Sequence, residues 1–311
     1  MRSKVTIVGA GQTGGAMARE LAPKGFADIV LLDVAEGVPQ GKALDMTQAG
    51  PLVGFDSRII GTNDWKDTAN SDIAIITSGK PRLPGMSRDD LVTANTEIVK
   101  GVTEQVVRHS PNAIIIVFVN PLDAMCYVVK KVSGLPRERV FGQSGVLDAA
   151  RFRSFIAREL DVSMEDVQAY VLGGHGEGMV PMMRHSNVCG VPLPELIPIE
   201  RLKALVERAR HRGTEIVNLL KTGSAAFAPG AALAAMIESI LQNTHRVMPC
   251  SAYCEGEFGL SGLYFGVPVQ IGRAGVERIV ELPLNAEERS ALEESAAKVR
   301  KVISGLSAFL K

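Results

Sequence analysis

The first half of the chain carries near-continuous apolar runs, separated by segments long enough to form helices. The runs lie at residues 5–8, 29–32, 73–77 and 114–119, with a shorter one at 139–141. Strands of uninterrupted aliphatic residues are typical of a parallel sheet, because helices cover both of its faces. The alternation of strand and helix therefore predicts a doubly wound α/β domain, whose binding sites lie beyond the carboxyl ends of the strands.

The pattern changes near Asp148, so we place a domain boundary between residues 147 and 148. The second part, residues 148–311, has mixed strand and helix patterns and predicts an α+β domain. Its expected elements are a strand at 167–172, an amphipathic helix at 201–220 with a break near Gly213, short strand patterns at 246–253 and 263–282, and a charged helix at 285–310.

A glycine-spaced turn follows the first apolar run directly. Its sequence is Gly9-Ala10-Gly11-Gln12-Thr13-Gly14. Gly9 allows a tight turn, Gly11 lets a diphosphate approach the backbone, and Gly14 lets the next helix lie close on the sheet. The free N–H groups at the start of that helix attract phosphates. This pattern alone is weak evidence, because a plain turn can have the same letters.

Asp33 strengthens the interpretation, since it ends the second apolar run about twenty residues after the last glycine. A carboxylate there accepts hydrogen bonds from both ribose hydroxyls of an adenosine, and it repels a 2′-phosphate. Residues 1–147 are therefore predicted to form a Rossmann domain that binds NAD in preference to NADP.

Composition narrows the class of partner. Lys plus Arg and Asp plus Glu number 34 each, so the formal net charge is zero and neither a nucleic acid nor a membrane surface is expected as a partner. The longest aliphatic run, residues 113–119, is too short to cross a bilayer, and the N-terminus lacks a signal-peptide layout. We expect a cytoplasmic protein.

Four scattered cysteines also fit a reducing compartment better than a disulfide framework. Cys250 and Cys254 are spaced like a metal pair, but no second pair or histidine cluster completes four ligands. Buried free thiols are the favoured interpretation, and no metal site is predicted.

Two segments that follow apolar runs carry candidate binding groups. Residues 78–88 contain two prolines, two glycines and the cations Lys80, Arg82 and Arg88. This segment is either a solvated loop or a lid that brings guanidinium groups onto an anionic substrate. Asn120 follows the run at 114–119, where its amide offers a donor and an acceptor beside the expected nicotinamide, although Asn-Pro is also a common turn opener.

His175 is the strongest candidate for proton transfer. It lies in Gly173-Gly174-His175-Gly176, directly after an expected strand, and flanking glycines let other groups approach the ring. Asp148 can serve as the carboxylate that orients a general acid/base histidine. Asp148 and Arg151 stand three residues apart on one helical face, so a simple intrahelical ion pair remains an alternative for them.

Taken together, five motifs in this order resemble the L-lactate/L-malate dehydrogenase family, with the likeness running from about residue 4 to 285. They are GAGQTG with Asp33, PRLPGMSR, NPLD, GVLDAAR and GGHG. The resemblance is strongest to the malate-specific branch built on the lactate-dehydrogenase plan. It implies a homo-oligomer, with a tetramer favoured over a dimer.

The resemblance also implies roles for individual residues. His175 would be the proton donor and acceptor, Asp148 its orienting partner, Arg151 the clamp on the C1 carboxylate, and Arg88 the lid residue that polarises the carbonyl. Residues that would contact cofactor or substrate, or line the pocket, are Gly9, Ala10, Gly11, Gln12, Thr13, Gly14, Asp33, Asn95, Val119, Asn120 and Ser224.

Arg82 is the position that faces the far end of the substrate in this family, so it decides the expected specificity. A guanidinium buried without an anion costs several kcal/mol, whereas a second substrate carboxylate makes a bidentate pair. Malate and oxaloacetate have that carboxylate, and lactate and pyruvate do not. We therefore expect an NAD-dependent dehydrogenase acting on the dicarboxylate malate.

Two alternatives remain open. In a lactate or other 2-hydroxy-acid dehydrogenase, Arg82 would point to solvent. A catalytically silent NAD-binding protein would need none of the residues His175, Asp148, Arg151 and Arg88, so their joint presence argues against it. One departure from the family pattern is Glu177, where relatives usually carry Asp. We expect this carboxylate to have a supporting role, so the change should affect the rigidity of the loop more than the activity.

Overall fold

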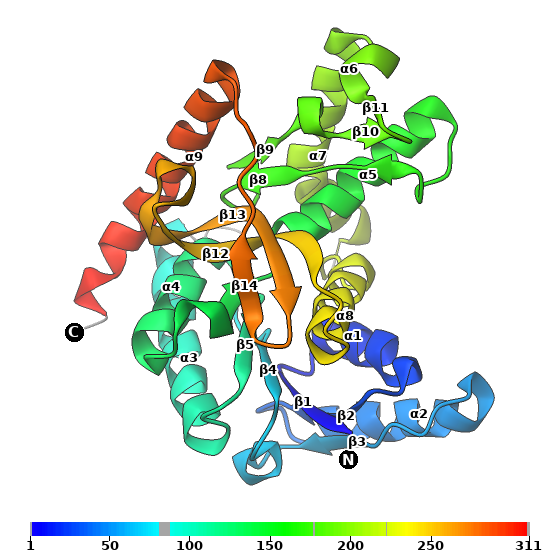
Figure 1. Ribbon diagram of the computed structural model, residues 1–311. Coiled ribbons are helices and arrows are strands. Elements are labelled where there is room, and N and C mark those ends of the chain that lie inside the picture. The colour runs from blue at the N-terminus through cyan, green and yellow to red at the C-terminus, as the bar shows by residue number, and fades with distance from the viewer. Residues whose placement is uncertain (1, 81–87, 177, 222, 310–311) are drawn as a thin grey trace.

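The computed structural model describes residues 2–80, 88–176, 178–221 and 223–309, without the side chains of residues 88, 89, 212, 214, 307 and 308 (Figure 1). Its centre is a nine-stranded sheet with the order β14-β13-β12-β6-β5-β4-β1-β2-β3. The strands from β6 to β3 run parallel to one another, as the apolar runs predict. They are β1 (Ser3–Val8), β2 (Ala27–Leu32), β3 (Ile59–Thr62), β4 (Ile73–Ile76), β5 (Ile114–Val117) and β6 (Val140–Gly142).

The sequence pattern missed the edge strand β3. Its four residues include Gly61 and only two aliphatic side chains, and the strand is half-buried at the end of the sheet. The apolar runs at 73–77 and 114–119 are therefore the fourth and fifth strands rather than the third and fourth.

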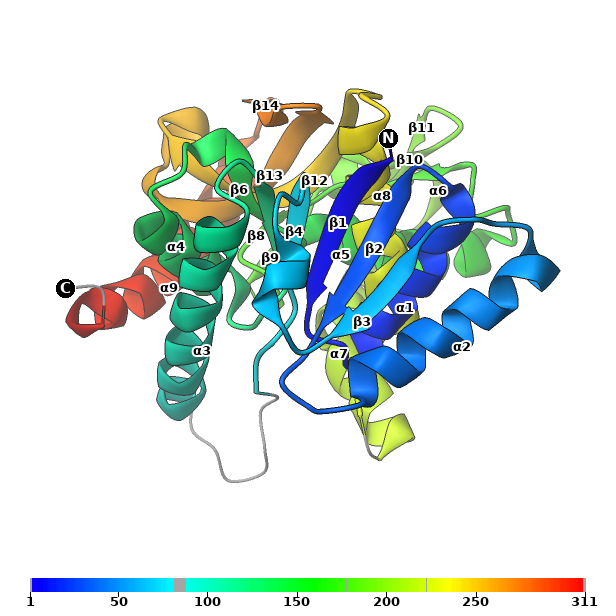
Figure 2. The ribbon, with the colours of Figure 1, turned by 90° about the horizontal axis from the view of Figure 1, so that it is seen from below.

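Helices cover both faces of the parallel strands. Helices α1 and α2 lie on one side, and α3 and α4 lie on the other (Figure 2). Their bounds are α1 (Gln12–Leu21), α2 (Val38–Val53), α3 (Arg88–His109) and α4 (Leu122–Ser133). Strand β4 shows why its apolar run is unbroken, since Ile75 packs into the core beneath α1 while Ile76 packs into the core beneath α3 and α4. The doubly wound arrangement is confirmed.

The remainder of the chain supplies the last three strands of this sheet, β12, β13 and β14, and adds smaller sheets and further helices. Its helices are α5 (Gly145–Leu160), α6 (Leu193–Leu196), α7 (Ile199–Leu220), α8 (Phe227–Leu241) and α9 (Ala286–Ser304). Its strands are β7 (Val167–Gln168), β8 (Val171–Gly173), β9 (Met179–Pro181), β10 (Asn187–Val188), β11 (Val191–Pro192), β12 (Arg246–Glu255), β13 (Ser261–Gly272) and β14 (Gly275–Ile279). Short 3₁₀ helices lie at Ala22–Lys24, Trp65–Thr68, Arg137–Arg139, Met183–His185, Glu257–Gly259 and Gly305–Ala308.

Three expectations for this part were wrong in detail. Residues 167–172 form two strands instead of one, because β7 pairs with β10 whereas β8 pairs with β9. Helix α7 continues through the exposed Gly213. One glycine destabilises a helix by about 1 kcal/mol relative to alanine, which is too little to break a helix of 22 residues. The last helix ends at Ser304, and a 3₁₀ turn follows it.

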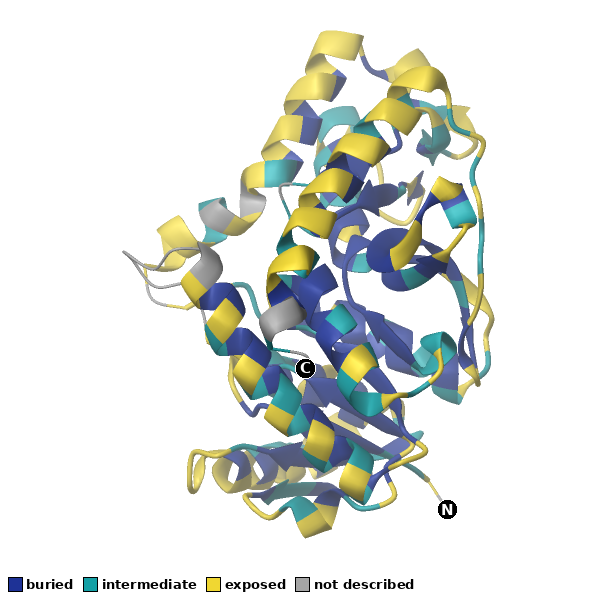
Figure 3. Ribbon diagram, turned by 90° about the vertical axis from the view of Figure 1, so that its left-hand side faces the viewer, coloured by how far each residue is buried: buried dark blue, intermediate teal, exposed yellow. Residues whose placement is uncertain are grey.

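Strand β12 joins the antiparallel hairpins to the parallel sheet. It pairs with β6 through Ser251 and Gly142. The buried hydroxyl of Tyr264, on β13, donates to the carbonyl of Val140 on β6 at 3.0 Å and strengthens the same junction. Figure 3 shows buried strands behind helices whose outer faces are exposed.

No helix in the described part of the chain is long and apolar enough to cross a membrane. Cys250 and Cys254 are both buried free thiols, as predicted, and burial raises the pKa of each. Among the residues that the structure describes, no group of three His, Cys, Asp or Glu side chains is placed to hold a metal ion.

Candidate functional site

The glycine turn and Asp33 lie against each other at the carboxyl ends of β1 and β2. The main-chain N–H of Gly9 donates to the carbonyl of Leu32 at 2.8 Å. The Asp33 carboxylate accepts the N–H of Ala10 at 2.7 Å and that of Ala35 at 3.0 Å. The acidic residue is thereby fixed beside the turn, where the sequence motif requires it.

The turn has the shape that a diphosphate needs. A Cβ atom at Gly14 would collide with the carbonyl oxygen of Gly9, so the start of α1 lies directly on the turn. By contrast, a Cβ built at Gly11 would meet no described atom within 4 Å. The backbone at Gly11 is therefore open to an approaching ligand, and α1, which begins at Gln12, supplies the N–H groups that favour an anion.

Lys42 is a residue of this turn that the sequence reasoning missed. Its ammonium group, carried by α2, donates to the carbonyl oxygens of Ala10 at 2.7 Å and Gly11 at 2.9 Å. These bonds hold the carbonyls on one side of the turn and place a positive charge next to it. No sequence signal indicates the contact, because 31 residues separate Lys42 from Gly11.

Asn95 connects two strand ends at the same edge of the sheet. Its amide oxygen accepts the N–H of Lys80 at 2.7 Å, and its amide nitrogen donates to the carbonyls of Lys80 at 3.2 Å and Asn120 at 2.7 Å. The Asn120–Pro121 peptide bond is cis. Asn95 therefore holds the main chain after β4 against the main chain after β5, and the buried Val119 lies against Gly79.

Gln143 lies just beyond the carboxyl end of β6 and is fully buried. Within the described ranges, neither its amide nitrogen nor its amide oxygen has a hydrogen-bond partner, and the same holds for the hydroxyl of Ser144. Buried polar groups in native proteins are paired, so we expect a ligand or water to supply the hydrogen-bond partners of these atoms. Together with the open turn at Gly11, they fit a nicotinamide dinucleotide bound across the strand ends. The sequence reasoning passed over Gln143, since its burial is not visible in the letters.

His175 and Asp148 are in contact, as predicted. Nδ1 of His175 lies 3.0 Å from Oδ2 of Asp148, and the two side chains are 11% and 2% exposed. A carboxylate only accepts hydrogen bonds, so Nδ1 carries the proton and Nε2 is left to react. Arg151 Nη1 lies 4.0 Å from Oδ1 of Asp148, at the outer limit of an ion pair.

The loop that carries His175 is held through its main chain. The N–H of Gly174 donates to the hydroxyl of Ser295 on α9 at 2.9 Å, and the N–H of His175 donates to Asp123 on α4 at 2.9 Å. A Cβ at Gly174 would press against Val299 of α9, so glycine is needed for this close approach. The sequence predicted the histidine but not these two main-chain hydrogen bonds.

Other predicted site residues are only partly placed. Arg82 and Glu177 lie outside the described residues, and so does the side chain of Arg88, although its backbone begins α3. The interpretation of residues 78–88 as a lid accordingly stays a prediction. Ser224 is exposed in the connection between α7 and α8.

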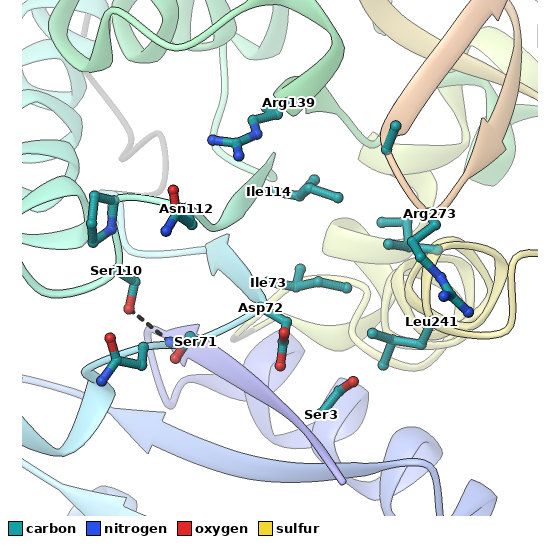
Figure 4. A pocket seen from close by; sticks show the side chains of 14 residues that line it. Ser3, Ser71, Asp72, Ile73, Ser110, Asn112, Ile114, Arg139, Leu241 and Arg273 are labelled. Atoms are coloured by element: carbon teal, nitrogen blue, oxygen red, sulfur yellow. Dashed lines mark hydrogen bonds between the residues drawn. The ribbon is translucent and has the colours of Figure 1, made fainter. Parts of the chain in front are cut away.

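A cavity of about 760 Å³ lies elsewhere, at the amino ends of β1, β4 and β5. Ser3, Ile73 and Ile114 line it (Figure 4). Arg139 and Arg273 border this space, and their guanidinium groups point in different directions (Figure 4). Its lining includes Asp72, Ser110 and Asn112, but none of the lining residues belongs to the glycine turn or to the loop of His175.

A dinucleotide turn and a histidine–carboxylate pair at one sheet edge define a nicotinamide-dependent dehydrogenase. Residues 3–142 match the family model described as the lactate/malate dehydrogenase NAD binding domain. Residues 145–310 match the lactate/malate dehydrogenase alpha/beta C-terminal domain. The chain belongs to the lactate/malate dehydrogenase family, and its cofactor is NAD.

Individual relatives are similar in sequence to this chain over nearly its whole length. The malate dehydrogenase of Desulforudis audaxviator is 55% identical over 305 residues, covering 98% of this chain and 99% of that protein. The solved malate dehydrogenase of Salinibacter ruber is 50% identical with a TM-score of 0.94, covering 98% of both chains. A lactate dehydrogenase of Cryptosporidium parvum, solved with lactic acid and NAD, is 44% identical with a TM-score of 0.95, covering 98% of both chains.

Lys42→Met tests the support that α2 gives to the glycine turn. We expect NADH to bind about tenfold more weakly, roughly 1.4 kcal/mol, because the loop carbonyls lose two donors and the turn loses a positive charge. Fluorescence titration with NADH measures the change. Lys24→Met, which removes a surface ion pair with Glu238, is the control and should bind NADH as the wild type does. Equal affinity of both variants would contradict the assignment.

Proposed function

We propose that this protein is an NAD-dependent malate dehydrogenase, which catalyses the reversible oxidation of (S)-malate to oxaloacetate. The observation that carries the chemistry is the 3.0 Å contact between His175 and Asp148, at the sheet edge that also holds the glycine turn. The malate dehydrogenases compared above support the choice of malate, since they are alike over nearly the full length.

Proton transfer follows from the way His175 is held. When bound, NAD accepts the hydride that leaves the hydroxyl-bearing carbon. In the oxidative direction, Nε2 of His175 takes the hydroxyl proton, because Nδ1 already donates to Asp148. The Asp148 carboxylate stabilises the imidazolium that forms and keeps the ring in one tautomer. In the reductive direction the same nitrogen returns the proton.

Three arginines are proposed to hold the substrate. Arg151, on α5 one turn after Asp148, would bind the C1 carboxylate as a bidentate partner. Arg88 would stabilise the charge that develops on the carbonyl oxygen, and Arg82 would pair with the second carboxylate. Ser224 is proposed at the pocket wall.

The proposed NAD site is the edge formed by the glycine turn, Asp33 and the segment from Val119 to Asn120. Asp33 would accept the adenosine ribose hydroxyls. Asn95 would act through the two main-chain segments that it joins, since its amide is already bonded to both. We propose an NAD-binding domain at residues 1–147 and a catalytic domain at 148–311, although α5 begins three residues before this boundary.

A lactate dehydrogenase is the alternative within the family, and the fold does not exclude it, given the solved Cryptosporidium parvum enzyme. Specificity therefore rests on Arg82. A site whose buried polar group is left unpaired by the wrong substrate discriminates by roughly 10⁴ or more. Pyruvate would leave Arg82 unpaired, whereas oxaloacetate would not.

The wild-type protein and Arg82→Gln should differ in substrate preference. With NADH we expect the wild type to favour oxaloacetate over pyruvate, and Arg82→Gln to lose roughly 10²- to 10⁴-fold in kcat/KM for oxaloacetate while gaining on pyruvate. Steady-state NADH absorbance measures both. Lys80→Gln, a nearby cation with no proposed substrate contact, should keep the wild-type preference. An Arg82→Gln variant with unchanged oxaloacetate preference would overturn this account of specificity.

We also propose a cytoplasmic homo-oligomer, a tetramer in preference to a dimer, with no nucleic-acid or membrane partner. Helix α2 supports self-association because Leu44, Leu52 and Val53 are 60%, 89% and 57% exposed on it. Apolar side chains grouped on one exposed element are typical of an interface. Sedimentation velocity at micromolar concentration should give a species of four chains, and a monomer would contradict the proposal.

A further inference from the structure

Asp123 is a buried carboxylate that the proposed reaction does not use directly. It lies in the first turn of α4 and is 6% exposed. Its Oδ2 accepts the main-chain N–H of His175 at 2.9 Å, and its Oδ1 accepts the hydroxyl of Ser251 on β12 at 2.6 Å. One side chain thus joins α4, β12 and the loop of the reactive histidine.

The ionised form of Asp123 is the form that these contacts favour. A main-chain N–H always donates, the Ser251 hydroxyl is free to donate, and the N-terminal turn of a helix stabilises negative charge. Burial acts in the other direction and raises the pKa of Asp123 above its ordinary value, although the bonds from Ser251 and His175 offset part of that rise. A buried carboxylate with both oxygens bonded is costly to form and indicates a specific use.

The charged surroundings of His175 come from several elements. Asp148 and Arg151 approach from α5, and Asp123 approaches from α4. Strand β12 contributes the neutral Ser251, and α9 contributes the neutral Ser295 next to Gly174. Asp123 interacts electrostatically with both His175 and Asp148. In the described surroundings, His175 therefore lies between two carboxylates, one bonded to its ring and one bonded to its main chain.

We propose that Asp123 is a positioning residue for His175: it fixes the main chain of the loop while Asp148 fixes the ring, and its buried charge favours the protonated imidazole. This inference rests on the proposed role of His175 as the general acid/base. The described hydrogen bonds of Asp123 go to the main chain of His175 and to Ser251, so we expect its effect on the reaction to pass through the histidine.

The sequence position of Asp123 gives this contact a second consequence. Asn120 and Asp123 are three residues apart, in the segment that leaves β5 and begins α4. Asn120 is held by Asn95, and Asp123 holds His175. The same short segment therefore sets the spacing between the strand end proposed for the cofactor and the proton-transferring ring.

Asp123→Asn tests the charge while keeping the shape. Histidine ring signals are followed by NMR against pH in protein with labelled histidine, and the His175 signal is assigned by its loss in His175→Gln. Without the negative charge the imidazolium is less stable, so the titration midpoint of His175 should fall by roughly half a unit to one unit. The acid limb of kcat/KM for malate oxidation, which needs the neutral ring, should move to lower pH by the same amount.

Two further variants separate charge from structure. Ser251→Ala removes a donor to the carboxylate, so it makes Asp123 harder to ionise and should shift the His175 midpoint in the same direction by less. Ser295→Ala loosens the neighbouring main-chain bond without touching a charge, so it should leave the midpoint at the wild-type value even if kcat falls.

The proposal is wrong if Asp123→Asn leaves the midpoint unchanged, or if Ser295→Ala shifts it as far. Should Asp123→Asn fail to fold by circular dichroism, an unshifted midpoint in Ser251→Ala would overturn the proposal on its own. The titration needs no substrate, so a protein that shows the shift but does not oxidise malate would refute the proposed function and leave the Asp123 contact standing.

Discussion

The hydrogen bond between Asp148 and His175 is the contact on which the site depends, because it joins two segments that are 27 residues apart in the sequence. Asp148 lies in the first turn of α5, the helix that follows the last parallel strand, whereas His175 lies in the loop between β8 and β9. Their 3.0 Å contact exists only when the loop lies against α5. The proposed proton transfer therefore depends on the packing of the loop between β8 and β9 against α5.

The loops at this edge of the sheet are held in the same way, by a polar side chain that is hydrogen-bonded to the main chain of another segment. Lys42 holds the glycine turn, Asn95 holds the ends of β4 and β5, and Asp123 holds the His175 loop. Main-chain groups beyond the strand ends leave the sheet ladder, and the side chains named here pair some of them. These bonds position the loops, while the backbone at Gly11 stays open to a ligand.

The sequence predicted the parallel strands, the glycine turn with Asp33 and the partnership of His175 with Asp148, since strand periodicity and motif spacing are local signals. It missed the edge strand β3, whose four residues carry too few apolar side chains to form a recognisable run. It also missed Lys42, Asp123 and Gln143. Contacts between positions tens of residues apart, and the burial of a single amide, depend on tertiary packing that no local pattern encodes.

The most direct test of the central claim is kcat/KM for oxaloacetate reduction in Asp148→Asn, measured beside the affinity for NADH. An asparagine of the same shape can donate to Nδ1 and stabilise the wrong tautomer, and it removes the charge that supports the imidazolium. The account predicts a fall in kcat/KM of at least about a hundredfold with NADH affinity unchanged. A variant within a few-fold of the wild type would contradict the assignment of His175 and Asp148 as the proton-transferring pair.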